Sequence, residues 1–327
     1  SDAIRMIDIN TTGDETSFGS LTAARARKYG GFGNSVRGGV AGGHAPADVI
    51  EYINFHSKGL ATDFGNLSEA KADVTTFSNA TRALHSGGVA AGDNIRNTIE
   101  YITISSAGNV TDFGDMLAVT RYHTSATSTT RGLMAGGEAS ATNQNVIQYV
   151  TIASTGDASD FGDLTGVKSY AGAVTSSTRA VFAGGNSQSA SQSVNTMDYI
   201  TIASTGNASD FGDLSRATDQ GCGLSSATRG VFTGGPTSGQ TVEYITIAST
   251  GNATDFGDLT VNRTYVTGLS SATRGVHAGG NGGGGETYSS VIDYITIAST
   301  GDSTDFGDLV TPANAPTGVS NDHGGLA

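Results

Sequence analysis

The chain has 327 residues, of which 48 are glycine and only 14 % are charged. Its 30 acidic residues outnumber the 17 basic ones, and the resulting net charge of −13 opposes binding to nucleic acid or to an anionic membrane surface. No apolar run approaches the ~18 residues of a membrane span, so we expect no insertion into a membrane.

Seven copies of one segment follow one another along the chain. In chain order they occupy residues 3–22, 49–68, 98–117, 146–165, 197–215, 242–260 and 291–310, and the copy at 242–260 reads VEYITIASTGNATDFGDLT. The motif phenylalanines of these copies are Phe18, Phe64, Phe113, Phe161, Phe211, Phe256 and Phe306. Successive phenylalanines are 45 to 50 residues apart, which indicates a repeat protein.

A second motif follows each of the first six copies and combines an arginine with a Gly-Gly pair. The motif arginines are Arg37, Arg82, Arg131, Arg179, Arg229 and Arg274. After the seventh copy the chain continues as TGVSNDHGGLA at 317–327. We interpret that segment as the beginning of a seventh motif.

One repeat contains four short segments with strand character. They are exemplified by TGLSS (267–271), RGVFTGG (229–235), VEYITIA (242–248) and DFGDLT (255–260). The third is apolar or β-branched at nearly every position, as expected of a strand covered on both faces. Four strands in a unit of about 47 residues are typical of a propeller blade.

The sequence therefore predicts an all-β fold in which residues 1–327 form a single seven-bladed β-propeller. We expect both ends of the chain to share the last blade, because a closed ring leaves no unpaired edge. Residues 317–327 would supply its first two strands and Ala3–Asn10 its third. The motif phenylalanines should be buried between the blades.

The Gly-Gly pair ending the second strand, the tyrosine in the third and the aromatic residue near the fourth resemble the kelch repeat. The chain differs from kelch in having phenylalanine in DFGDL where tryptophan is usual. SSATRGVFTGG (225–235) and YITIASTGNATDFGDL (244–259) look like repeats in virion proteins of tailed bacteriophages, especially those of marine bacteria. This resemblance covers essentially the whole chain. It implies kelch-like blades and a place in the virion, an extracellular particle assembled in the host cytoplasm.

Two repeated motifs allow both a functional and a structural interpretation. Paired aspartates such as Asp255 and Asp258 could bind calcium, but one loop offers too few of the roughly six to eight oxygens that calcium takes. We favour aspartates that accept hydrogen bonds from backbone N–H groups in the turn. The motif arginines could line an anion site. We expect instead that each pairs with an acid of its own or a neighbouring blade, such as the aspartate of DFGD.

No catalytic arrangement stands out from the repeats. The string DFG occurs six times, but the HRD loop, glycine-rich loop and lysine of a protein kinase are missing. The six histidines are scattered without metal-ligand spacing. Cys222 suits a small channel-lining position better than the cross-linked cysteine of a kelch-type copper oxidase. We therefore predict no catalytic residue, no metal site and no cofactor.

The loops divide into two sets. Those joining strands 1–2 and 3–4 of a blade share one face and hardly vary between copies. The strand 2–3 loops and the connections between blades share the other face, here named the variable-loop face, and they do vary. Recognition loops would give this pattern, and so would neutral drift. The predicted binding residues on this face are Asp93, Arg96, Glu138, Asn143, Gln144, Gln188, Gln192, Gln240, Glu286 and Tyr288 from the strand 2–3 loops, with Tyr29, Arg121, Tyr122, Tyr170 and Tyr265 from the connections.

These features together favour a non-enzymatic structural or binding protein. The repeat wording favours a bacteriophage virion protein that contacts other virion proteins or a glycan or protein of the host surface. A cellular lectin-like or scaffolding kelch propeller is the alternative that the same loops allow. A copper- or calcium-dependent kelch-type enzyme is a further alternative.

Overall fold

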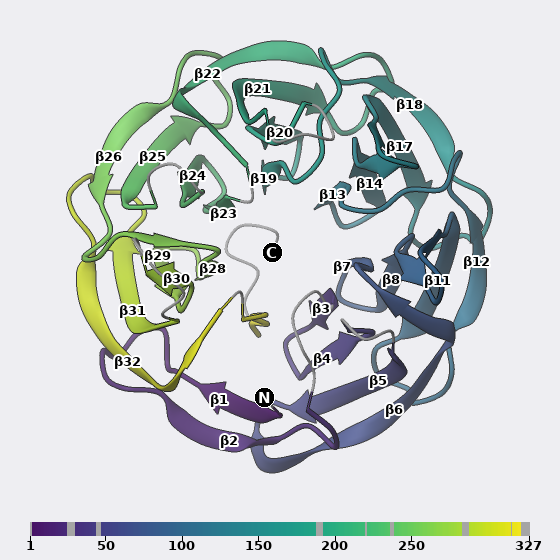
Figure 1. Cartoon of the computed structure of the whole chain (residues 1–327), viewed down its shortest axis with the longest axis horizontal. Coiled ribbons are helices and arrows are strands. Elements are labelled where there is room, and N and C mark those ends of the chain that lie inside the picture. The colour runs from purple at the N-terminus through teal and green to yellow at the C-terminus, as the bar shows by residue number, and fades with distance from the viewer. Residues whose placement is uncertain are drawn as a thin grey trace.

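The computed structural model describes residues 2–24, 30–43, 47–187, 192–219, 221–235, 239–282, 288–314 and 316–321. Within these ranges every regular element is a β-strand, and the sheets are arranged around a central axis (Figure 1). No helix long and apolar enough to span a membrane occurs among them. The fold is a β-propeller, as the repeat pattern predicts.

Six blades are four-stranded antiparallel sheets whose first strand lies nearest the axis (Figure 1). Blade 1 contains β3 (Gly30–Gly33), β4 (Arg37–Ala41), β5 (Ala47–Asn54) and β6 (Ser57–Ala72). Blade 2 contains β7 (Thr75–Ser78), β8 (Arg82–Ser86), β11 (Thr98–Thr103) and β12 (Thr111–Asp115). Blade 3 contains β13 (Thr124–Thr127), β14 (Arg131–Ala135), β17 (Val146–Thr151) and β18 (Ser159–Asp163). Blade 4 contains β19 (Gly172–Thr175), β20 (Arg179–Ala183), β21 (Val194–Thr201) and β22 (Ser209–Thr218); blade 5 contains β23 (Cys222–Ser225), β24 (Arg229–Thr233), β25 (Thr241–Thr246) and β26 (Thr254–Asp258); blade 6 contains β28 (Thr267–Ser270), β29 (Arg274–Ala278), β31 (Ser289–Thr296) and β32 (Thr304–Ala313).

Short strand pairs lie between these blades. They are β9 (Val89–Ala90) with β10 (Asn94–Ile95), β15 (Glu138–Ala139) with β16 (Thr142–Asn143), and β27 (Arg263–Thr264) with β30 (Asn281–Gly282). The first pair extends the sheet of blade 1, whose strand order becomes β10-β9-β6-β5-β4-β3. Strand β10 is therefore the edge of a six-stranded sheet.

The N-terminal strands β1 (Ala3–Met6) and β2 (Thr16–Ser20) form a two-stranded sheet between blades 6 and 1 (Figure 1). The contacts of this sheet with blade 6 repeat those found between complete blades. The Arg274 guanidinium donates to the Ile9 carbonyl at 2.9 Å, and the Gly13 N–H donates to the Phe306 carbonyl at 2.6 Å.

The described part of the C-terminal segment lies near the axis, between the innermost strands of blades 6 and 1. A Cβ added to Gly318 would lie 2.7 Å from the Leu269 side chain of β28, and one added to Gly31 of β3 would lie 2.9 Å from Thr317. Residues 322–327, predicted to supply the next strand, are outside the described residues. The described chain thus shows six four-stranded blades and one two-stranded sheet, rather than seven complete blades.

The core consists of apolar layers between neighbouring blades. All seven motif phenylalanines are buried, with exposed fractions of 2 to 5 %, which confirms their predicted burial. Phe161 of β18, for example, packs edge-on against Tyr149 at 5.8 Å and shares a cluster with Ile200 and Ile202 of blade 4. The unbroken apolar pattern of the third strands follows from this packing, since each is covered on both faces.

The DFG motif forms a joint with the next blade. Gly257 has φ 140° and lies so close to blade 6 that an added Cβ would be 2.5 Å from the backbone of Gly301. The Gly301 N–H donates to the Phe256 carbonyl at 2.7 Å, and the Asp302 carboxylate accepts the Asp258 N–H at 3.0 Å. The turn aspartate Asp302 therefore satisfies an N–H of the neighbouring blade. The DFGD aspartates, to which our expectation referred, accept an N–H of their own strand in three blades, as Asp160 does from Gly162 at 3.1 Å.

The predicted pairing of the motif arginines with an acid is wrong. Each guanidinium donates instead to a backbone carbonyl of the next blade and lies over a tyrosine ring of its own blade. Arg229 donates to the Ile297 carbonyl at 2.8 Å and lies 4.2 Å from the centre of the Tyr244 ring. The role is structural, as we favoured, because an arginine reaches two blades without needing a buried carboxylate.

Candidate binding site between blades 2 and 3

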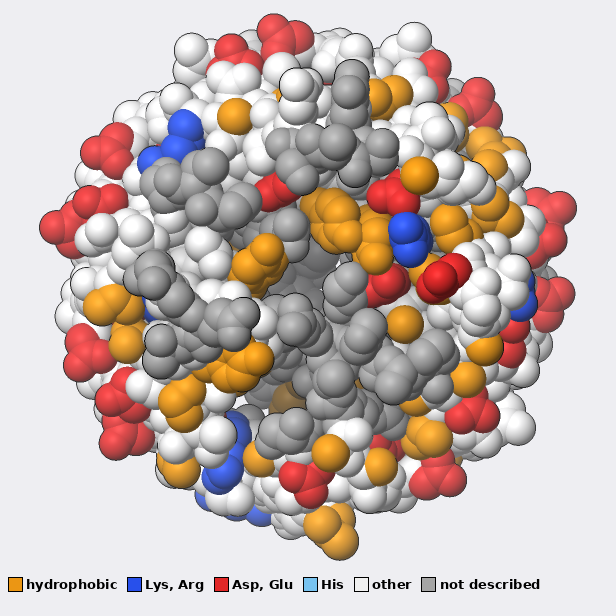
Figure 2. Space-filling model, viewed as in Figure 1, with side chains coloured by type: hydrophobic (Ala, Val, Ile, Leu, Met, Phe, Trp, Pro, Cys, Tyr) orange, Lys and Arg blue, Asp and Glu red, His pale blue; other side chains and the backbone are white. Residues whose placement is uncertain are grey.

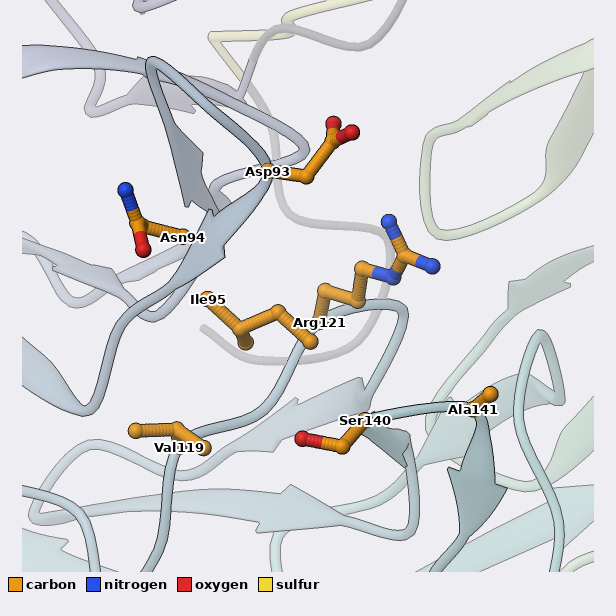
Figure 3. Close-up of a pocket in the computed structure, with 7 residues that line it drawn as sticks. All are labelled: Asp93, Asn94, Ile95, Val119, Arg121, Ser140 and Ala141. Atoms are coloured by element: carbon orange, nitrogen blue, oxygen red, sulfur yellow. The ribbon is translucent and has the colours of Figure 1, made fainter.

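Two neighbouring hairpins enclose a pocket. Strands β9 and β10 join at a turn containing Asp93, and β15 and β16 join at Ser140 and Ala141. The pocket between them has a volume of about 490 Å³ and is lined by Asp93, Asn94, Ile95, Val119, Arg121, Ser140 and Ala141. In Figure 3 the Arg121 side chain extends between Asp93 and the Ser140–Ala141 turn.

The backbone around this pocket is strained. Asp93, Ser140 and Ala141 have positive φ values of 58°, 47° and 64°, and Tyr122, which follows Arg121, has φ 57°. Residues other than glycine rarely adopt this conformation, at a cost of about 1–3 kcal/mol each. The value at Tyr122 recurs at Asp73, Tyr170 and Tyr265, the equivalent positions of three other connections, and therefore belongs to the repeat. Asp93, Ser140 and Ala141 lie in the turns of the two hairpins that enclose the pocket.

Arg121 is held by Glu138 of the second hairpin. The two residues exchange backbone hydrogen bonds of 3.1 and 2.8 Å, and the guanidinium donates to one Glu138 carboxylate oxygen through Nη2 at 2.7 Å and Nε at 3.3 Å. Burial disfavours the charged guanidinium, but the hydrogen bond to Glu138 and nearby phenols outweigh burial and raise the pKa of Arg121. The arginine is a fixed cation at the pocket wall.

The rings of Tyr122 and Tyr170 stack beside this arginine. Their centres are 4.3 Å apart, and the Arg121 guanidinium lies 4.8 Å from the centre of the Tyr122 ring. Burial, together with a hydrogen bond to the Tyr122 side chain, raises the pKa of the Tyr170 phenol, which stays protonated. Because Tyr122 is covered by a ring and a guanidinium, it cannot stack on a sugar as its sequence position suggested.

The connection between blades 2 and 3 differs from three others. Those connections bury a cation against an acid of the next blade's third strand: Lys71 with Glu100, Lys168 with Asp198, and Arg263 with Asp293. Here the corresponding residues are Thr120 and Gln148, which are uncharged and buried. The cation is instead Arg121, one residue further on, which is partly exposed and lines the pocket.

The pocket combines charges of both signs with apolar surface. Asp93 is exposed and has no hydrogen-bond or ion-pair partner in the described part of the chain. Ile95 and Val119 give the apolar wall, and 38 % of Val119 is exposed. In Figure 2 hydrophobic, basic and acidic side chains meet at the rim of the central hollow, on the side where Figure 1 shows β7 and β13.

The structure thus brings together five of the predicted binding residues: Asp93, Arg121, Tyr122, Glu138 and Tyr170. Sequence reasoning missed Asn94, Ile95, Val119, Ser140 and Ala141. Asn94 and Ile95 lie within the variable strand 2–3 loop 89–97, and Ser140 and Ala141 lie within the variable loop 138–145. Val119 gives no signal in the sequence, because an apolar residue is common at any position.

Other predicted residues lie apart from this site. Arg96 pairs with Glu69 at 2.6 Å, Asn143 is buried and donates to the Asn186 carbonyl, and Gln144 donates to Thr142 in its own hairpin. Gln240 donates to the Leu259 carbonyl at 3.1 Å, and these side chains support loops. Gln192 and Tyr288 are exposed, and Tyr265 has a positive φ of 56° in the connection to blade 6. Tyr29, Gln188 and Glu286 lie outside the described residues.

Within the described ranges no three histidine, cysteine, aspartate or glutamate side chains are grouped to hold a metal ion. Burial lowers the pKa of His85 and His277 to about 3 and that of His123 to about 4, with nearby cations adding to the effect for the first two. Burial also raises the pKa of the Cys222 thiol to about 12, so it is not a reactive thiolate. These groups serve packing.

Comparison with known proteins supports the fold alone. No protein-family profile matches the sequence, and no curated protein does. Among solved structures, the one titled "Structure of YjhT" superposes with a TM-score of 0.66 over 87 % of this chain and 98 % of that chain, at 10 % sequence identity. Similarity at this level supports a kelch-type β-propeller and transfers no activity.

Proposed function

We propose that the chain is a non-enzymatic binding propeller whose variable-loop face contacts a partner through the pocket between blades 2 and 3. One observation carries this proposal: the ion pair with Glu138 fixes Arg121 at the wall of a pocket that it shares with the exposed carboxylate of Asp93. Propellers commonly use loops on a rigid scaffold in this way.

We assign this role to a virion protein of a tailed bacteriophage, contacting another virion protein or the host surface. The proposal is supported by the resemblance of the repeat sequences to those of phage virion proteins and by pocket residues suited to binding. A ring of seven blades completed by both chain ends belongs to the same proposal. It is supported by the β1–β2 sheet beside blade 6 and by residues 317–318 between β28 and β3.

The test is a map of the contacts between chains in the native particle, combined with attachment of variant particles. We expect contacts to concentrate at the hairpins of blades 2 and 3. Arg121→Ala should weaken attachment at temperatures where circular dichroism shows the variant still folded, although loss of the Glu138 ion pair lowers its melting temperature. Asp305→Asn removes an exposed charge from the outer strand of blade 6 and serves as the control. Contacts mainly on the face of the TGN turns would contradict the proposal, and so would isolation of the chain only as a cellular protein.

A further inference from the structure

The pocket lies along an open strand edge. Strand β10 ends its sheet, and both of its residues line the pocket. Ile95 lies opposite Val89, and the next residue, Arg96, donates its N–H to the Gly88 carbonyl at 2.9 Å. Because hydrogen-bonded and non-bonded pairs alternate in an antiparallel ladder, the N–H and C=O of Ile95 point away from β9. No strand in the described ranges pairs with them.

Two side chains extend this hydrogen-bonding edge. Arg121 uses Nε and Nη2 for Glu138, and its Nη1 has no partner in the part of the chain that the structure describes. Asp93 offers an exposed carboxylate at the hairpin tip, one residue from β10. The edge thus presents two donors and two acceptors beside the apolar surface of Ile95 and Val119.

Resting on the proposed function, we infer that the occupant of this site is an extended peptide segment of a partner protein, added as a further strand to β10. Its backbone pairs with the N–H and C=O of Ile95, and one of its carbonyls accepts from Arg121 Nη1. An apolar side chain lies on Ile95 and Val119, and a basic side chain reaches Asp93. The excess of acid in the chain, with a net charge of −13, favours a basic segment.

The chemistry of the pocket favours a peptide over a saccharide. None of its seven lining residues is aromatic, and the nearby Tyr122 ring is covered by Tyr170 and Arg121. A sugar would therefore find no ring to stack on. A strand edge supplies the paired donor and acceptor that a peptide backbone needs.

Ile95→Pro tests the inference directly. Proline removes the outward N–H but no bond to β9, and edge strands tolerate proline in that orientation. The probe is the peptide most enriched from a library of random linear dodecapeptides selected on the intact chain, with affinity measured by titration calorimetry. We expect Ile95→Pro to weaken binding at least about tenfold, while Ile95→Val stays within about twofold.

A second variant keeps the test valid if Ile95→Pro fails to fold. Asp93→Asn retains a residue that tolerates positive φ and removes only the charge. We expect it to weaken binding about threefold or more, with Asp305→Asn unchanged. Failure to enrich any peptide, equal affinity of the wild type and Ile95→Pro, or binding of arrayed saccharides that Asp93→Asn abolishes would each overturn the inference. Particle attachment that depends on Arg121 but not on Ile95 would leave the proposed function standing without a peptide occupant.

Discussion

At the scale of single residues, one set of three side chains recurs at each complete blade. A motif phenylalanine packs edge-on against a tyrosine, and a motif arginine covers that tyrosine while donating to the next blade. In blade 4 these are Phe211, Tyr199 and Arg179, with a ring-centre distance of 5.8 Å and a guanidinium-to-ring distance of 4.3 Å. Each set links the inside of one blade to its neighbour.

Phe211→Ala should lower the free energy of unfolding by about 3–5 kcal/mol, because it removes a fully buried ring between two well-packed blades. Chemical denaturation followed by circular dichroism measures the change. Val310→Ala, which truncates a side chain that is 66 % exposed, is the control and should change stability little. A Phe211→Ala effect below about 1 kcal/mol would place the ring outside the core.

The buried histidines make stability depend on pH. Burial, together with the nearby Arg263, lowers the pKa of His277 from its ordinary value of 6.5 to about 3 in the folded chain. As the pH falls below about 6.5, His277 binds a proton in the unfolded chain but stays neutral in the folded chain. Stability is therefore complete above that pH and declines towards pH 3, by at most about 1.4 kcal/mol per pH unit for each such histidine.

His277→Met should flatten this decline, because Met134 occupies the equivalent position in blade 3. The measurement is the slope of unfolding free energy against pH between 7 and about 4.5, rather than stability at one pH. Leu60→Met, a change at an exposed residue that does not titrate, should leave the slope as it is. An unaltered slope in His277→Met would mean that this histidine titrates normally.

Some contacts of single residues could be predicted from the sequence and others could not. Burial of the phenylalanines followed from their repetition in a strand pattern. The arginine partners did not, because a backbone carbonyl of the next blade has no side-chain identity to recognise. The three buried ion pairs of the connections were likewise missed. Each joins residues 29 or 30 positions apart, but the residue types differ between them: Lys–Glu, Lys–Asp and Arg–Asp.

At the scale of elements, the outer strand and the turn of the next blade form the recurring joint. Six glycines of the described phenylalanine-glycine motifs, from Gly65 to Gly307, have φ between 133° and 146° and would place a Cβ 2.3 to 2.5 Å from the neighbouring turn. The glycine is therefore needed for its missing side chain as well as for its φ.

Gly257→Ala should destabilise the chain by about 2 kcal/mol or more, because the blades must separate to admit a methyl group. Gly166→Ala is the matched control: nothing lies within 4 Å of its added Cβ, and its φ is not positive. Thermal unfolding of the two variants makes the comparison. Equal melting temperatures of the two variants would show that the contact between Gly257 and the Gly301 turn can admit a methyl group without loss of stability.

The site was only partly predictable at this scale. Loop variability directed attention to the segments that form the two hairpins, and the predicted residues included Asp93 and Arg121. It could not show that the connection between blades 2 and 3 has the uncharged pair Thr120 and Gln148 where three other connections have a buried ion pair. This difference depends on which residues meet across a blade junction. Nor could it show that the Tyr122 ring is already covered.

At the scale of the whole molecule, the β1–β2 sheet and residues 317–318 both lie between blades 6 and 1. Deleting residues 317–327 should expose the inner strands of blades 6 and 1 and cause aggregation, because Leu269 and Gly31 lose the segment between them. Size-exclusion chromatography with light scattering would detect the larger species. The full-length chain is the reference. A truncated chain that stays monomeric with an unchanged melting temperature would show that these residues are dispensable for the ring.

The hydrogen bond from Arg274 to Ile9 joins residues 265 positions apart, and it has a consequence for synthesis. Translation delivers the β1–β2 sheet first and its blade 6 partner last. While the ribosome makes the intervening blades, the first strands have no neighbour on that side. The nascent propeller therefore carries an unpaired edge while blades 1 to 5 are made, and this last contact forms only after blade 6 has emerged.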